Sequence, residues 1–234
     1  MNLLYRMACR ARGRGPAALA RLFEQAAEPH AAELGVGMEA LRARGQAWML
    51  VQLGLAVRRW PEPGEPVEVL TWPSGRTAGA RAWREFEVVS ASGATLAEAA
   101  SVWLIVDLER RRPVRLPRFL LELDFPARRT RIEPAAVPEP PATPAEVHCR
   151  TVLEEDLDIN EHVNNASYIG WAEALAEWEH LRRLQADYLG EALLGEQITV
   201  ETWELEQGGQ VLQRISGPRG LCVSVQWWQD RLAE

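Results

Sequence analysis

The chain has no lysine, only three cysteines among its 234 residues, and no apolar run long enough to cross a bilayer as a helix. The cysteines Cys9, Cys149 and Cys222 lie far apart, without the paired spacing of a zinc site or a disulfide framework. The first residues also lack the apolar stretch of a signal peptide. We therefore expect a reduced, cytoplasmic protein without a membrane span.

The chain has fewer basic than acidic residues: 26 arginines and 33 aspartates and glutamates give a net charge of -7. This balance argues against general affinity for nucleic acid. The sequence also has no glycine-rich phosphate loop and no zinc or calcium motif, so we expect neither a cofactor nor a metal. With 47% hydrophobic and 25% charged residues, the composition is that of an ordinary globular protein.

A proline-rich segment divides the chain. Residues 133–146 contain five prolines and no large aromatic residue, which predicts an extended, semi-rigid linker. We therefore expect an N-terminal domain over residues 1–132 and a C-terminal domain over residues 147–234. We expect the N-terminal domain to bind substrate and to contain no catalytic residues, and the C-terminal domain to contain the catalytic residues.

Both parts show the same predicted order of a strand, a helix and an antiparallel meander. In the first part, a strand at residues 3–9 precedes a helix whose apolar residues recur at helical spacing from Leu19 to Leu34, before Gly35. Short turns containing glycine then separate four predicted strands. These strands cover residues 48–57, 65–72, 81–89 and 96–107.

The second part predicts a strand at residues 147–153, a helix at residues 165–188 and three strands at residues 197–206, 211–216 and 222–228. A long helix lying across an antiparallel sheet, present twice, is typical of an α+β fold. This arrangement is the hot-dog fold, so we predict a double hot-dog whose two repeats share one sheet.

The densest polar segment runs from Asp156 to Asn165, directly before the second predicted helix. One interpretation is an elaborate helix start, since an asparagine there can cap unpaired N–H groups. Capping needs only one residue, however, whereas Asp158, Asn160 and His162 alternate along the segment. An extended segment would place these three side chains on one side, where they form a competent proton-transfer unit.

The first predicted helix starts differently, because Gly13 to Pro16 contain no such polar set. We therefore expect one working site per chain. Backbone N–H groups at the start of the second helix are expected to stabilise a developing oxyanion.

Over nearly its whole length the sequence resembles the acyl-acyl carrier protein (acyl-ACP) thioesterases of plants and bacteria, which have a tandem double hot-dog fold, and we identify it as a bacterial member. The most specific match is the sixteen-residue stretch that runs from Asp156 to Trp171. Shorter matches follow the family order in the first part: residues 45–50, Thr71-Trp72, residues 100–103, and Asp107 with residues 110–113.

The resemblance implies hydrolysis of fatty acyl-ACP, with Asp158, Asn160 and His162 as catalytic residues. A plant cysteine on the following strand aligns at or beside Glu206, where this chain has no cysteine. We therefore predict attack by water that His162 polarises, assisted by Asp158 or Glu206, with Asn160 orienting the water or the carbonyl. The alternative for Glu206 is an exposed residue beside a hairpin turn.

The family resemblance also implies an acidic partner, the acyl carrier protein. The richest basic stretch precedes the linker and is either a docking patch or a solvated loop. It comprises Arg110, Arg111, Arg112, Arg115, Arg118, Arg128, Arg129 and Arg131. Three other functions stay open: a thioesterase of the same fold acting on coenzyme A esters, a related hydratase, and a non-catalytic acyl-binding module. We expect a monomer or a homodimer.

Overall fold

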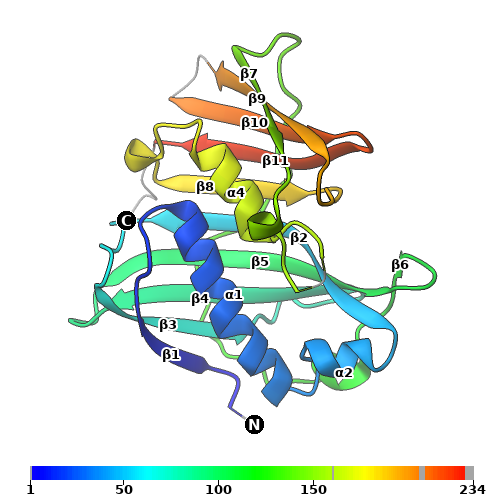
Figure 1. The fold of residues 1–234 in the computed structure, drawn as a ribbon. Helices are drawn as coiled ribbons and strands as arrows, with labels where there is room; N and C mark the ends of the chain where they lie inside the picture. The colour runs from blue at the N-terminus through cyan, green and yellow to red at the C-terminus, as the bar shows by residue number, and fades with distance from the viewer. Residues whose placement is uncertain (1, 160, 206–208, 230–234) are drawn as a thin grey trace.

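One antiparallel sheet organises the protein, and a computed structural model describes residues 2–159, 161–205 and 209–229 of it. The strands follow the order β1-β3-β4-β5-β2-β8-β11-β10-β9-β7, and β6 pairs with β5. The two central strands, β2 and β8, come from different halves of the chain. The sheet is therefore continuous across both repeats (Figure 1).

The elements of the first repeat follow the predicted order closely. They are β1 (Tyr5–Arg10), α1 (Pro16–Glu33), α2 (Met38–Arg42), β2 (Gln46–Val57), β3 (Pro66–Pro73), β4 (Arg81–Ser90), β5 (Thr95–Asp107), β6 (Arg112–Pro113) and α3 (Arg118–Leu121).

The second repeat is shorter. It consists of β7 (Glu146–Thr151), the 3-10 turn η1 (Glu154–Asp156), α4 (Asn165–Glu173), the 3-10 turn η2 (Trp178–His180), β8 (Arg183–Tyr188), β9 (Gln197–Leu205), β10 (Gln210–Gly217) and β11 (Gly220–Trp228). Read from the two edges inward, β1, β3, β4, β5 and β2 correspond to β7, β9, β10, β11 and β8. This two-fold repetition confirms the α+β double hot-dog prediction.

The predicted helix at residues 165–188 is wrong over its second part. The helix α4 ends at Glu173, and the residues from Arg183 to Tyr188 form the central strand β8. Leucine, glutamine and alanine in this segment favour a helix when considered alone. The segment instead pairs with β2 on one side and β11 on the other, so tertiary pairing overrides local propensity.

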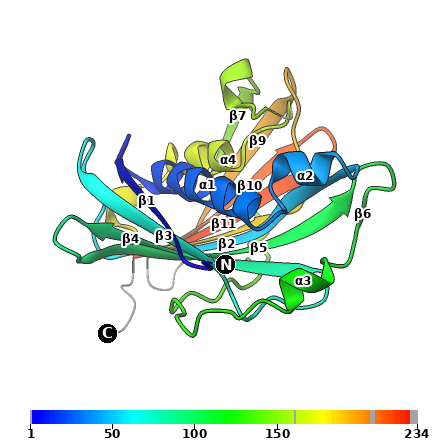
Figure 2. The ribbon, with the colours of Figure 1, turned by 90° about the horizontal axis from the view of Figure 1, so that it is seen from below.

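The two faces of the sheet are covered differently (Figure 2). Helices α1, α2 and α4 lie on one face, while α3 and the segment that follows it cross the other. On that second face Thr130 N–H donates to the buried Glu85, and Val137 N–H donates to Asp187 at 2.6 Å. A side chain at Gly54 would lie 2.6 Å from Ile132, so the crossing segment packs directly on the central strand.

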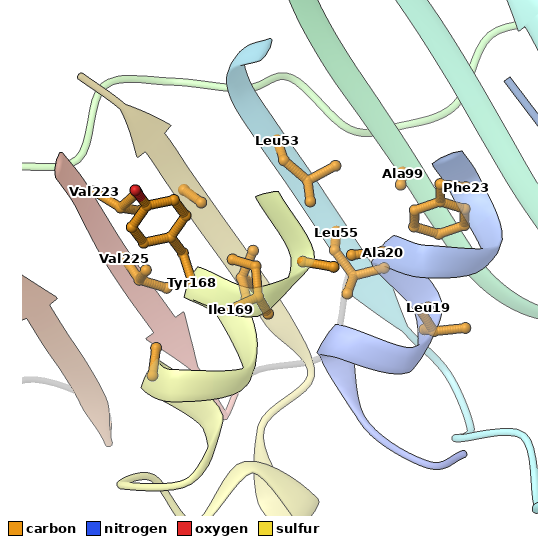
Figure 3. Packing of buried hydrophobic residues seen from close by; sticks show 14 of the residues in the cluster. Leu19, Ala20, Phe23, Leu53, Leu55, Ala99, Tyr168, Ile169, Val223 and Val225 are labelled. Atoms are coloured by element: carbon orange, nitrogen blue, oxygen red, sulfur yellow. The ribbon is translucent and has the colours of Figure 1, made fainter. Parts of the chain in front are cut away.

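The main core lies between the two long helices and the centre of the sheet (Figure 3). Leu19 and Phe23 of α1, Ile169 of α4 and Leu55 of β2 contribute to it, and all four are buried. The helix contact also satisfies a helix end, because Glu173 Oε2 of α4 accepts from Ala17 N–H in the first turn of α1 at 2.9 Å. The repeats are thus joined through their helices as well as through β2 and β8.

Candidate active site

A tight turn precedes α4 and carries the polar segment singled out by the sequence. Leu157 and Val163 form an antiparallel bridge across it, Asp158 N–H donates to His162 O at 2.8 Å, and Glu161 N–H donates to Asp158 O at 3.1 Å. The expectation of an extended segment is therefore wrong. The chain reverses instead, with Glu161 in the left-handed region at φ 62°, and this reversal brings Asp158 back to His162.

The carboxylate of Asp158 lies against the backbone of His162, whose N–H donates to Oδ1 at 3.4 Å. Asn160, the third residue of the predicted set, lies outside the described residues. The structure thus brings Asp158 and His162 together, and the role of Asn160 stays a prediction.

Asp156 anchors the turn to the protein. Its carboxylate is 7% exposed and accepts from Arg150 Nη2 at 3.0 Å, from Leu153 N–H at 2.9 Å and from Trp171 Nε1 at 3.0 Å. The Arg150 guanidinium also stacks on the Trp171 ring, 4.5 Å from its centroid. Asp156 therefore holds the site in place, although it stands beside Asp158 in sequence.

The start of α4 is capped by Asn164, as the structural interpretation of the segment predicts. Its Oδ1 accepts from Ala166 N–H at 2.8 Å, while its Nδ2 donates to Glu24 Oε2 of α1 at 3.1 Å. Burial is the main cause that raises the pKa of Glu24, and the hydrogen bond from Asn164 opposes it. The first repeat thus places a carboxyl group at the start of the second repeat's helix.

The carboxylate that lies at the His162 ring belongs to Glu191, in the loop between β8 and β9. Glu191 Oε2 is 3.5 Å from His162 Nδ1, and the His162 side chain is 51% exposed. A carboxylate at Nδ1 orients an imidazole and leaves Nε2 free to exchange a proton. The pair Glu191–His162 is therefore a candidate proton-transfer unit whose histidine lies directly before α4.

Glu191 is absent from the predicted site residues, because the segment of β8 was predicted to be helix. The plant cysteine was aligned with the strand predicted at residues 197–206, and this alignment placed the assisting carboxylate at Glu206. The strand that follows α4 is β8, and Glu191 lies three residues beyond its end. A correct boundary for α4 is the signal that would have found it.

Glu206 itself lies outside the described residues, so its role stays a prediction. Its described neighbours Leu205 and Gln210 pair at the end of β9 that is opposite to Gln197. The loop with Glu191 and Glu196 joins β9 at the Gln197 end. The described structure therefore supports Glu191 as the partner of His162.

A small apolar cavity of about 20 Å³ lies between α1, the sheet and the start of α4. Glu24, Asn165 and Tyr188 line it on the side of the second repeat, and its other walls come from α1, β2, β4 and β5. Those walls are Ala20, Phe23, Ala27, Leu50, Leu53, Phe86, Ser101 and Trp103. The cavity reaches Asn165, three residues beyond His162.

The three cysteines lie on three different strands. Cys149 is exposed on the edge strand β7, and Cys9 is on the opposite edge strand. Cys222 is buried in β11, and burial raises the pKa of its thiol, which disfavours the thiolate. His30 is buried and hydrogen-bonded, with its Nδ1 3.1 Å from Arg84 Nη1.

Within residues 2–159, 161–205 and 209–229, no cluster of three or more His, Cys, Asp or Glu side chains is arranged to hold a metal ion. No helix in the same part of the chain has the length and apolar character that a bilayer crossing requires.

Comparisons with known proteins give the chain a family. Residues 15–123 match the acyl-ACP thioesterase N-terminal domain, and residues 142–221 match the acyl-ACP thioesterase C-terminal domain. The chain is 31% identical over 145 residues to the chloroplastic palmitoyl-acyl carrier protein thioesterase of Cuphea hookeriana, a match that covers 55% of this chain and 32% of that protein. It is 24% identical over 228 residues to the chloroplastic oleoyl-acyl carrier protein thioesterase 1 of Arabidopsis thaliana, covering 86% and 62%. The chain therefore spans about a third of the first relative and less than two thirds of the second.

Two solved structures share the fold. An acyl-ACP thioesterase from Bacteroides thetaiotaomicron superposes with a TM-score of 0.86 at 21% identity, covering 97% of this chain and 98% of that one. A 12:0-ACP thioesterase from Umbellularia californica gives a TM-score of 0.81 at 20% identity, covering 97% of each chain. Since both domain families match in order and together span most of the sequence, the chain belongs to the acyl-ACP thioesterase family.

Proposed function

We propose that this chain hydrolyses the thioester bond of fatty acyl-ACP and releases a free fatty acid, which ends chain elongation. The observation that carries the proposal is the pair Glu191–His162, whose histidine directly precedes α4, the helix whose first residue, Asn165, lines the apolar cavity. A proton-transfer pair next to an apolar cavity suits a substrate with a reactive carbonyl at the end of a hydrocarbon chain.

In this mechanism Glu191 orients the His162 ring through Nδ1, and Nε2 accepts a proton from a water molecule. The hydroxide equivalent adds to the thioester carbonyl carbon and forms a tetrahedral oxyanion. Collapse of that intermediate breaks the carbon–sulfur bond, and His162 returns its proton to the leaving thiolate. The half-exposed ring gives water direct access, and no cysteine takes part.

The start of α4 is the expected place for the oxyanion. Asn164 already engages the N–H groups of Ala166 and Ser167, and its own N–H donates to Asp156 O. Asn165 N–H belongs to the first turn of the helix, where the backbone N–H groups have no carbonyl of a preceding turn to bond to. We assign this donor to the developing negative charge, with Asn160 as a further candidate for orienting the carbonyl or the water.

The N-terminal domain, residues 1–132, is proposed to bind the acyl chain. The C-terminal domain, residues 147–234, is proposed to supply His162 and its carboxylate, and residues 133–146 to link the two domains. The acidic carrier protein would meet the basic stretch before the linker. Several of its arginines already pair within the chain, such as Arg118 with Glu122 at 2.6 Å and Arg128 with Glu87. The exposed turn around Arg110 and Arg112 is the part that stays accessible to an acidic partner.

The experiment that tests the proposal is a hydrolysis assay over acyl-ACP substrates of several chain lengths. We expect His162→Ala to lower kcat/KM at least about 100-fold, as expected for loss of a general base. The matched control is His180→Ala, which changes another exposed histidine of the second repeat. Near-normal hydrolysis by His162→Ala would contradict the mechanism.

The same acyl groups on coenzyme A separate the alternatives. A higher kcat/KM on coenzyme A esters than on carrier-bound esters would favour a coenzyme A thioesterase of this fold. Binding of acyl chains without hydrolysis of either ester would favour a non-catalytic acyl-binding module.

A further inference from the structure

Two non-glycine residues in the described parts of the chain have a left-handed backbone, Arg111 at φ 51° and Glu161 at φ 62°. Side chains larger than hydrogen disfavour this region, and such residues often occur at functional sites. Glu161 precedes His162 directly. Arg111 belongs to the first repeat, yet its side chain reaches the same place, because it contacts Glu191.

The carboxylate of Glu191 divides its two oxygens between different partners. Oε1 accepts from Arg111 Nη2 at 3.0 Å and lies 3.5 Å from Arg219 Nη1, whereas Oε2 lies 3.5 Å from His162 Nδ1. Arg219 Nη2 also donates to the backbone carbonyl of Glu191 at 3.1 Å. With Oε1 held by two guanidinium groups, rotation of the carboxylate is restricted and Oε2 stays directed at the imidazole.

Arg111 lies in the turn between β5 and β6. Asp107 closes the turn by accepting from Arg110 N–H at 2.8 Å and from Arg110 Nη1 at 3.1 Å. Arg110 is therefore used locally, and the left-handed backbone at the next residue directs Arg111 across to the second repeat. The side chains of Arg110 and Arg111 are similarly exposed, at 75% and 78%, but Arg110 pairs with Asp107 and Arg111 pairs with Glu191.

We propose that Arg111 is a positioning residue that the first repeat supplies to the active site of the second. It holds Glu191 Oε1 so that Oε2 orients His162, and it touches neither substrate nor the reacting atoms. The inference rests on the proposed function. An isolated exposed ion pair contributes little, but this one belongs to a network of two cations on one carboxylate at the end of a constrained turn.

The test compares Arg111→Gln, Arg111→Lys and the control Arg6→Gln, which also removes one arginine of an exposed ion pair, on two thioesters with the same acyl group. One substrate is carried by acyl carrier protein, and the other is the N-acetylcysteamine ester, which has no protein part. A positioning role predicts that Arg111→Gln lowers kcat roughly tenfold on both substrates with KM little changed. Arg111→Lys should recover part of the loss, and Arg6→Gln, which removes an exposed arginine outside the basic stretch, should behave as the unchanged protein.

A double-variant experiment separates positioning from general damage to the fold. If Arg111 acts through Glu191, then adding Arg111→Gln to Glu191→Gln should lower kcat no further. An additive loss in the double variant would overturn the inference.

Two other outcomes would also decide. A loss confined to the carrier-bound substrate, expressed in KM and shared by a further variant, Arg110→Gln, would make this turn a docking surface and overturn the positioning role. Normal activity of Arg111→Gln on the small ester would overturn the positioning role of Arg111 and leave the proposed function intact. If the unchanged protein hydrolysed neither ester, the proposed function would fall, and the inference with it.

Discussion

Asn164 Nδ2 donates to Glu24 Oε2 at 3.1 Å and so joins the first turn of α4 to the middle of α1. The same side chain caps its own helix through Oδ1. One amide therefore fixes the helix start next to His162 and ties it to the other repeat.

Replacing Asn164 tests this double role. We expect Asn164→Ala to lower the free energy of unfolding by roughly 2–3 kcal/mol, because it removes the cap and leaves a partly buried carboxyl group without its donor. Asn164→Ser should cost less, since serine keeps the cap and loses only the bond to Glu24. Urea denaturation measures both values, and equal stability of the two variants would show that the bond to Glu24 contributes nothing.

Glu24→Gln should stabilise the protein at neutral pH. Burial raises the pKa of Glu24 in the folded state, so the stability present below the unfolded pKa is lost as the pH rises through the folded pKa. Glutamine avoids this cost and still accepts from Asn164. The variant should therefore be more stable than the unchanged protein at pH 7, and the difference should shrink toward pH 4. The control is Glu33→Gln, which changes an exposed glutamate of the same helix and should not give a stability gain of this kind at pH 7.

His30 should make folding sensitive to mild acid. Burial and, secondarily, the Arg84 guanidinium lower the pKa of His30 to about 4. Its stabilising contribution is present above the unfolded pKa of about 6.5 and is lost as the pH falls through the folded pKa. The stability advantage over His30→Gln should thus fall by roughly 2 kcal/mol between pH 7 and pH 4.5. The exposed His148→Gln should show no such trend in the same denaturation series.

Two neighbouring aspartates should separate stability from catalysis. Asp156→Ala leaves the Arg150 guanidinium and the Trp171 N–H without their acceptor, so we expect a loss of about 3–5 kcal/mol in the free energy of unfolding. Asp158→Ala should change stability by less than about 1 kcal/mol, typical of a surface position, while it lowers kcat. Thermal unfolding and thioester hydrolysis are measured on both variants. If the two variants lost equal stability and equal kcat, the separation of roles between Asp156 and Asp158 would be contradicted.

The cavity predicts how chain length is limited. Ala27 of α1 lines it, so Ala27→Leu should fill part of the space and reduce kcat/KM for the longest accepted acyl chains more than for short ones. Gln25→Leu places the same side chain on the exposed side of α1 and is the matched control. An unchanged chain-length profile for Ala27→Leu would show that acyl chains bind elsewhere.

Much of the fold follows from local patterns. The apolar spacing of α1, the glycine turns between the strands and the repeated element order predict both repeats, because helix and strand periods are written directly in the sequence. The prediction fails at β8, where the segment from Arg183 to Tyr188 is flanked by strands on both sides and carries no alternating pattern. A central strand buried on both faces looks the same as a buried helix until its partners are known.

Residue patterns along the chain predict the double hot-dog class, the polar segment before α4 and His162 as the central candidate. They do not predict which carboxylate lies at the imidazole. Glu191 reaches His162 because the loop after β8 folds back against the turn before α4, and Arg111 reaches Glu191 from the other repeat. Contacts between segments so far apart in the chain depend on how β2 and β8 join the two repeats, and no local pattern of residues encodes that junction.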